Sequence, residues 1–307
     1  MKKIALFGGS GFVGLNFIQE KGHKYDITVF GRKDSHEFYV NNTLYPYTHT
    51  DYQLLELESI IKEFDLVVNL SAAKVRKGLT LPDYMESAYI ADKLMQACLQ
   101  VNCKKYIHIS SRLVYKINAA SPWKENSPEE PMNYYGIAKL VSDKLLLLYN
   151  KRNESDMISL RASQVYGLLD GEIDPGQKES LIIKCIEHAE DKVAQKILER
   201  AVGARDYLYV KDLVKAIDLA IQSESANGIY NIASGEKHSP LDVAKIVNKI
   251  YDNPSGIKLI SGGVYDSMLV ELDITKARAE LNYNPDYCLS QGILDMKKKR
   301  GTIYESK

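Results

Sequence analysis

The chain has 307 residues, of which 40 are basic and 40 are acidic, so its formal net charge is zero; 45% of the residues are hydrophobic. This length suits one large α/β unit or two closely joined lobes with a sizeable core. The balanced charge does not favour nucleic-acid binding, no apolar stretch is long enough to span a bilayer, and the cysteines and histidines lack metal-ligand spacing. We therefore expect a cytoplasmic protein without a nucleic-acid partner, a membrane contact or a metal.

The first segment of the chain predicts a strand, a glycine-rich turn and a helix. An apolar run over residues 3–7 leads into the sequence GGSGFVG, after which apolar residues recur at helical spacing. Glycines here let the backbone turn sharply and approach a pyrophosphate, which the N-terminus of the helix attracts. The sequence predicts dinucleotide contacts from Gly8, Ser10, Gly11, Phe12, Val13 and Gly14.

The following segments alternate between short apolar runs and helical patterns. Residues 27–30, 66–70, 106–110 and 157–160 have the continuous apolar character of buried parallel strands. We predict an α/β fold with a Rossmann-like, doubly wound parallel sheet and a smaller C-terminal substrate-binding lobe. Residues 1–166 would form the cofactor-binding domain, to which 205–235 return; 167–204 and 236–307 would form the smaller lobe, with Gly171, Pro175 and Gly176 marking a loop.

The residues after the second predicted strand bear on cofactor choice. An acidic residue at this point commonly binds the ribose 2′-hydroxyl of NAD, but this chain has Gly31-Arg32-Lys33. An arginine here can bind the 2′-phosphate of NADP instead. Arg32 therefore favours NADP(H), while the nearby Asp34 leaves NAD(H) possible.

Tyr135 and Lys139 form the most informative pair in the chain. Spacing four on a helix puts the phenol and the ammonium group on one face. A cation there, with a positively charged nicotinamide ring beside it, would lower the tyrosine pKa from about 10 toward the working pH. Such a phenol can exchange a proton with an alcohol or sugar oxygen while hydride moves to or from the cofactor.

Together these motifs resemble the extended short-chain dehydrogenase/reductases, in particular the group of nucleotide-sugar epimerases, dehydratases and reductases that serves deoxysugar and polysaccharide biosynthesis. The resemblance covers nearly the whole chain. It implies that Ser111, in the segment SSRLVY, orients the reacting sugar oxygen, and that Tyr135 and Lys139 complete the catalytic set. It also implies that Tyr135 and Lys139 contact the cofactor, with Lys139 holding the ribose hydroxyls. It further implies cofactor contacts from Leu70, Ser71 and Ala72, and substrate contacts from Gln164 and Arg205.

One departure from the group narrows the reaction. The 4,6-dehydratases typically carry Asp-Glu directly after the serine or threonine, where this chain has Arg112 and Leu113. Leucine cannot transfer a proton, so this chemistry is disfavoured. The resemblance then points to NADP(H)-dependent reduction of a nucleotide-linked 4-keto-6-deoxy sugar. A 4-epimerase or 4-dehydrogenase with retained NAD is the first alternative, and a non-catalytic cofactor-binding sensor is the second.

The resemblance also implies a homodimer. In the group, two helices, here about 87–101 and 133–151, pack against their copies in a four-helix interface. The run of leucines at 145–148 could serve that interface or be buried against the sheet.

Overall fold

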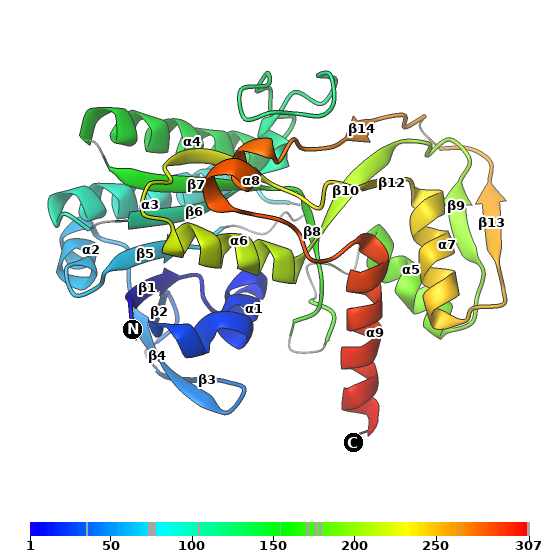
Figure 1. Ribbon diagram of the computed structural model, residues 1–307, viewed down its shortest axis with the longest axis horizontal. Helices are drawn as coiled ribbons and strands as arrows, with labels where there is room; N and C mark the ends of the chain where they lie inside the picture. The colour runs from blue at the N-terminus through cyan, green and yellow to red at the C-terminus, as the bar shows by residue number, and fades with distance from the viewer. Residues whose placement is uncertain are drawn as a thin grey trace.

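The computed structural model describes residues 1–34, 36–72, 78–103, 105–153, 155–169, 172–174, 177, 180–263 and 265–305. Within these residues a sheet of eight strands forms the centre of the larger lobe (Figure 1). Its strands are β1 (Lys3–Phe7), β2 (Asp26–Gly31), β3 (His36–Val40), β4 (Thr43–His49), β5 (Leu66–Asn69), β6 (Lys105–Ser111), β7 (Asp156–Ala162) and β11 (Gly228–Ile232).

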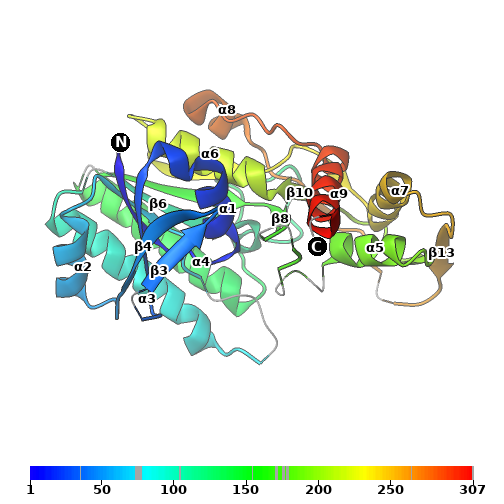
Figure 2. The same cartoon turned by 90° about the horizontal axis from the view of Figure 1, so that it is seen from below.

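The order of the strands across the sheet is β11-β7-β6-β5-β1-β2-β4-β3, and every neighbouring pair is parallel except β3 and β4. Helices cover both faces of the sheet (Figure 2). One face carries α1 (Phe12–Lys21), α6 (Val210–Gln222) and α8 (Thr275–Leu281), and the other carries α2 (Leu54–Ile61), α3 (Leu81–Gln100) and α4 (Tyr134–Asn153). This arrangement confirms the predicted α/β class with a doubly wound sheet.

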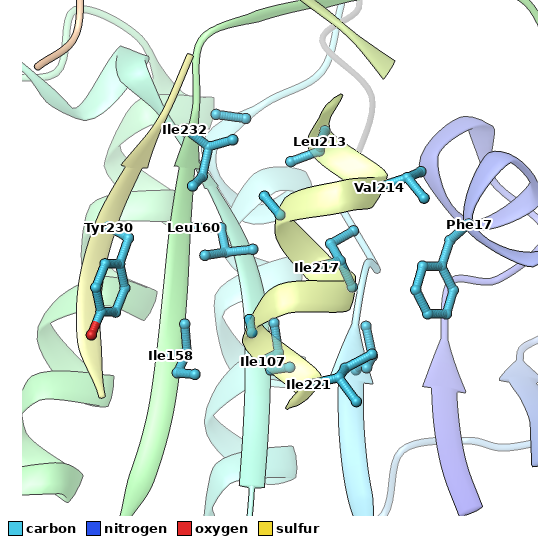
Figure 3. Close-up of a cluster of buried hydrophobic side chains, with 14 of the residues drawn as sticks. Phe17, Ile107, Ile158, Leu160, Leu213, Val214, Ile217, Ile221, Tyr230 and Ile232 are labelled. Carbon is cyan, nitrogen blue, oxygen red and sulfur yellow. The ribbon is translucent and has the colours of Figure 1, made fainter. Parts of the chain in front are cut away.

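Helix α6 illustrates why the apolar pattern produces this layering. Its apolar residues recur every three or four positions, so Leu213, Ile217 and Ile221 lie on the side that faces the sheet (Figure 3). There they meet Ile107 and Leu160, which are fully buried. Burying each large aliphatic side chain contributes about 1.5–3 kcal/mol, so this face alone holds the helix firmly on the sheet.

The sequence did not predict the edge hairpin of β3 and β4. Its apolar residues alternate with exposed ones, so the hairpin lacks the continuous apolar runs of the central strands. The available signal was Asn41-Asn42: both residues have positive φ, of 49° and 59°, as a two-residue hairpin turn requires.

The smaller lobe lies beyond the carboxyl ends of the main strands (Figure 1). It contains the helices α5 (Leu181–Glu190), α7 (Pro240–Tyr251) and α9 (Leu289–Glu305) and the paired strands β9 (Gln195–Leu198) and β13 (Ile257–Ile260). A second sheet next to it is built from β8 (Gln164–Tyr166), β10 (Ala204–Tyr209), β12 (Lys237–His238) and β14 (Leu269–Val270). The predicted loop residues Gly171, Pro175 and Gly176 lie outside the described residues.

The division of the chain into a cofactor domain and a substrate lobe stays a prediction. Two large clusters of buried hydrophobic side chains correspond to the two predicted parts. One lies on the α1/α6 face of the main sheet, and the other lies among α5, α7 and α9. Residues near the C-terminus join both clusters, since Leu272 and Leu281 pack in the first and Ile293 in the second. None of the helices in the described ranges is both long and apolar enough to cross a membrane.

Candidate active site

The glycine turn joins β1 to α1 at the carboxyl edge of the main sheet. Helix α1 begins after Gly11, and no described side chain caps its first N–H groups or adds an acidic charge to its first turn. Gly14 packs so closely on the turn that a Cβ atom there would lie 2.5 Å from the Gly9 Cα. The turn therefore keeps open N–H donors at a helix N-terminus, which suits a pyrophosphate.

A cavity of about 430 Å³ opens beside this turn. It gathers seven of the predicted cofactor residues: Gly8, Ser10, Gly11, Arg32, Leu70, Ser71 and Ala72. Phe12, Val13 and Gly14 lie behind it; the Phe12 ring packs against the apolar cluster of the smaller lobe, and Val13 packs against that of the main sheet. Concave shape, uncapped donors and polar lining together fit a dinucleotide.

Arg32 has a partner that sequence reasoning did not identify. Its guanidinium forms a two-pronged ion pair with Glu86 of α3, with Nη2–Oε1 and Nη1–Oε2 distances of 2.6 and 3.1 Å. Both side chains are about half exposed, at 54% and 55%, and both line the cofactor cavity. An exposed pair of this kind contributes about 0–1 kcal/mol, so Arg32 can exchange the carboxylate for a phosphate at little cost. Nothing in the spacing of Glu86 from Arg32 along the chain marks this contact.

The three predicted catalytic residues lie close together, where the carboxyl end of β6 meets the first turns of α4. Ser111 ends β6, and its hydroxyl accepts a hydrogen bond from the Leu113 N–H at 3.2 Å. The Lys139 ammonium lies 5.8 Å from the centre of the Tyr135 ring and donates to the Ile109 carbonyl at 2.6 Å. Tyr135 and Lys139 follow Ser111 by 24 and 28 positions in the sequence, and the structure brings all three together at the carboxyl edge of the main sheet.

Local features hold α4 close to Ser111. The Asn133 side chain accepts a hydrogen bond from the Gly136 N–H at 2.8 Å and so caps the helix. A Cβ atom on Gly136 would lie 2.4 Å from the Leu113 carbonyl oxygen. Glycine is therefore required for the helix to approach the turn after β6, and this approach sets Tyr135 beside Ser111.

Burial controls the protonation of the catalytic pair. It raises the pKa of Tyr135 to about 12, although a hydrogen bond with Ser111 acts in the opposite direction. It lowers the pKa of Lys139 to about 8, against the influence of Asp143. In the protein alone, desolvation of the phenol decides the direction of the Tyr135 pKa shift. The expectation that Lys139 and a positively charged nicotinamide ring together lower this pKa stays a prediction.

A buried ionic network anchors α4 to the strands beneath the site. Asp143, one helical turn beyond Lys139, pairs with Arg161 of β7 at 2.8 Å and accepts hydrogen bonds from Ser110 and Ser159 at 3.0 and 2.6 Å. Arg161 also pairs with Glu129 at 2.6 Å. The side chains of Asp143 and Arg161 are completely buried, so these contacts fix the distance between the helix and the sheet.

The predicted substrate residues meet where the second sheet approaches the main sheet. Gln164 accepts a long hydrogen bond, 3.4 Å, from Nη2 of Arg112. Arg205 instead pairs with Asp266 at 2.5 Å. Asp266, which sequence analysis missed, lines a cavity of about 760 Å³ between segments 117–121 and 265–269. A cavity of that size suits a small-molecule ligand.

Comparison with known proteins agrees with this geometry. The family model described as the NAD dependent epimerase/dehydratase family matches residues 4–233. The chain belongs to this family of nucleotide-sugar-modifying enzymes, whose members use NAD or NADP.

Individual relatives span nearly the whole chain. It is 25% identical to the dTDP-4-dehydro-6-deoxyglucose reductase of Escherichia coli, over 94% of this chain and 95% of that protein. It is 23% identical to the low-salt glycan biosynthesis protein Agl12 of Haloferax volcanii, over 94% and 96%. Among solved structures, the UDP-N-acetylglucosamine 4-epimerase of Bacillus cereus superposes with a TM-score of 0.84 at 23% identity, over 98% and 99% of the two chains. At that identity the superposition is evidence of the fold alone.

Proposed function

We propose that this protein reduces a nucleotide-linked 4-keto-6-deoxy sugar with NADPH. The observation that carries the proposal is the convergence of Ser111, Tyr135 and Lys139 at the carboxyl end of β6, a strand of the same parallel sheet whose β1 leads into the glycine turn and its cavity. NADPH supplies the hydride that is added to the keto carbon. Tyr135 then supplies the proton that the new alcohol oxygen needs, so that one hydride and one proton convert the ketone to an alcohol.

The protonation of Tyr135 favours reduction over oxidation. With a pKa of about 12, the phenol carries its proton at neutral pH, which is the form that a proton donor requires. Reduced nicotinamide is uncharged, so it does not shift that pKa as oxidised nicotinamide would. Ser111 orients the carbonyl oxygen, while Lys139 holds the ribose and its positive charge favours the phenolate that remains after transfer.

The choice of NADPH is supported by Arg32 on the wall of the cofactor cavity. A specific observation favours a second candidate. Glu86 already neutralises Arg32, and an enzyme that keeps this pair intact would hold NAD, as a nucleotide-sugar 4-epimerase or 4-dehydrogenase. The same three catalytic residues serve that chemistry.

The dimer is also part of the proposal. Tyr89 of α3 and Leu147 and Leu148 of α4 are 63%, 38% and 39% exposed, whereas Leu146 is fully buried. The leucine run therefore divides between the core and the exposed face of α4, a helix that packs against α3. We infer that this face contacts a second copy of the chain, which sedimentation of the purified protein would test.

Tyr135→Phe tests the catalytic assignment because it removes the phenol hydroxyl and keeps the ring. With NADPH and a dTDP-linked 4-keto-6-deoxyhexose, we expect turnover to fall by at least ~10²-fold while NADPH binding is unchanged. Tyr134→Phe is the matched control, since Tyr134 is the adjacent helix residue and is half exposed. Near-normal turnover of the Tyr135 variant would remove this residue from the mechanism.

A further inference from the structure

Two cysteines, Cys98 and Cys103, lie together where α3 ends. Cys98 belongs to the last turn of this helix, and Cys103 follows it just before β6 begins at Lys105. The start of β6 is at the amino edge of the main sheet, whereas the candidate active site is at the carboxyl edge, where β6 ends with Ser111. The pair is therefore separate from the residues to which the proposed reaction assigns a role.

The turn between the two cysteines has the hydrogen bonds of a Schellman motif. The Cys103 N–H donates to the Cys98 carbonyl at 2.8 Å, and the Asn102 N–H donates to the Leu99 carbonyl at 3.3 Å. Asn102 has a positive φ of 53°, the left-handed conformation that this motif requires. The side chains of the two residues that share the longer-range hydrogen bond commonly contact each other in such a turn. Here these residues are the cysteines, so the backbone holds their thiols next to each other.

The two thiols differ in burial and in acidity. Cys98 is 1% exposed and belongs to the apolar cluster on the α2/α3 face of the sheet. Burial raises the pKa of its thiol well above the ordinary value. Cys103 is partly exposed, and a hydrogen bond with the Cys98 thiol lowers the pKa of Cys103, against the effect of burial. Because the thiolate is the reactive form of cysteine, Cys103 is the more reactive of the two.

We propose that Cys98 and Cys103 are a redox-sensitive pair that closes to a reversible disulfide when the protein meets hydrogen peroxide. An accessible, reactive cysteine next to a second thiol is the arrangement typical of such pairs. The proposal goes beyond the proposed function and does not depend on it.

The oxidation has two steps. The Cys103 thiolate attacks one peroxide oxygen; the O–O bond breaks, Cys103 becomes a sulfenic acid, and the departing hydroxide takes up the proton that the thiol released. The Cys98 thiol then attacks the Cys103 sulfur, the S–O bond breaks, and a second water leaves as the S–S bond forms. Two thiols lose two electrons and two protons in total, and one peroxide is reduced to two waters. The disulfide protects Cys103 from irreversible oxidation to a sulfinic acid, and a thiol reductant reopens it.

Mass spectrometry of the full-length protein after treatment with hydrogen peroxide tests the proposal. The wild type should lose the mass of two hydrogen atoms, peptide mapping should place the new bond between Cys98 and Cys103, and dithiothreitol should reverse the change. Cys98→Ala should instead accumulate sulfenic and then sulfinic acid on Cys103, because no neighbouring thiol intercepts the first product. Cys103→Ser should leave the buried Cys98 reduced. Cys288→Ser is the matched control, since Cys288 is also partly exposed; this variant should form the disulfide as the wild type does.

Three results would overturn the proposal. Cys98 and Cys103 could both stay reduced under conditions that oxidise Cys288, which would show that the pair is inert. The new bond could link Cys103 to a second copy of the chain, which a non-reducing gel would reveal as a covalent dimer. Equal rates of sulfinic acid formation on Cys103 in the wild type and in Cys98→Ala would show that Cys98 intercepts nothing. All of these readouts are independent of turnover, so failure of the proposed function would leave them unaffected.

Discussion

The two arginines at Arg161 and Arg32 sit in contrasting surroundings. Arg161 and its partner Asp143 are 0% exposed and share their hydrogen bonds with the strands below the site. Arg32 and Glu86 are each more than half exposed at the mouth of the cofactor cavity. The buried pair fixes α4 against the sheet, whereas the exposed pair can open at little cost in free energy. We propose that the buried pair sets the geometry of the candidate active site and that the exposed pair influences which cofactor binds.

The largest effect should come from breaking the buried pair. Arg161→Met leaves Asp143 charged and unpaired in the core, and we expect the free energy of unfolding to fall by about 3–5 kcal/mol. Lys116→Met is the control, because Lys116 pairs with Glu130 where both side chains are about half exposed; its loss should be within about 1 kcal/mol. Urea unfolding measures both. Similar losses in the two variants would contradict the contrast between buried and exposed pairs.

An intermediate effect should follow the protonation of Lys139. Because its pKa is lowered to about 8, turnover should decline as the pH rises through 8 and the charge beside Tyr135 disappears. Stability should respond in the opposite direction. The folded state binds fewer protons at Lys139 than the unfolded state between pH 8 and about 10.5, so this group increases stability with rising pH in that window.

Lys139→Met separates these two effects. The variant should lose at least ~10²-fold in turnover and should be no less stable than the wild type at neutral pH, since it no longer buries a charge. Rates and urea unfolding across pH 7–10 provide both readouts. A wild-type rate that stays flat through pH 9 would show that the charge of Lys139 is not needed.

The smallest effect should come from the exposed pair. Glu86→Gln frees Arg32 without removing it, so NADPH should bind several-fold more tightly while NADH affinity changes little, consistent with the 0–1 kcal/mol of such a pair. Arg32→Gln should abolish any preference for NADPH. Fluorescence titration of both variants measures this. Equal changes for the two cofactors would mean that the pair does not decide between them.

Features that depend on residues close together in the sequence could be predicted, whereas contacts between distant segments of the chain could not. Continuous apolar runs predicted the central strands, and the glycine turn predicted its own position, because both are local signals. The partners of the arginines were beyond reach: Glu86 and Asp266 come from distant segments, and charged residues on helices and loops carry no pattern that reveals a contact. The Tyr135 pKa also depended on burial, which one helix cannot indicate. The hairpin at Asn41-Asn42 did carry a local signal, and that prediction was missed.

The most direct test of NADPH-dependent reduction is to record the absorbance spectrum of the freshly purified protein, extract any bound cofactor, and then titrate with NADPH and NADH. We predict clearly tighter binding of NADPH, since Arg32 would exchange Glu86 for the 2′-phosphate. We also predict little retained cofactor, because a reductase releases its oxidised cofactor after each turnover. Stoichiometric NAD or NADH carried through purification would contradict this and would identify the epimerase or dehydrogenase as the better account.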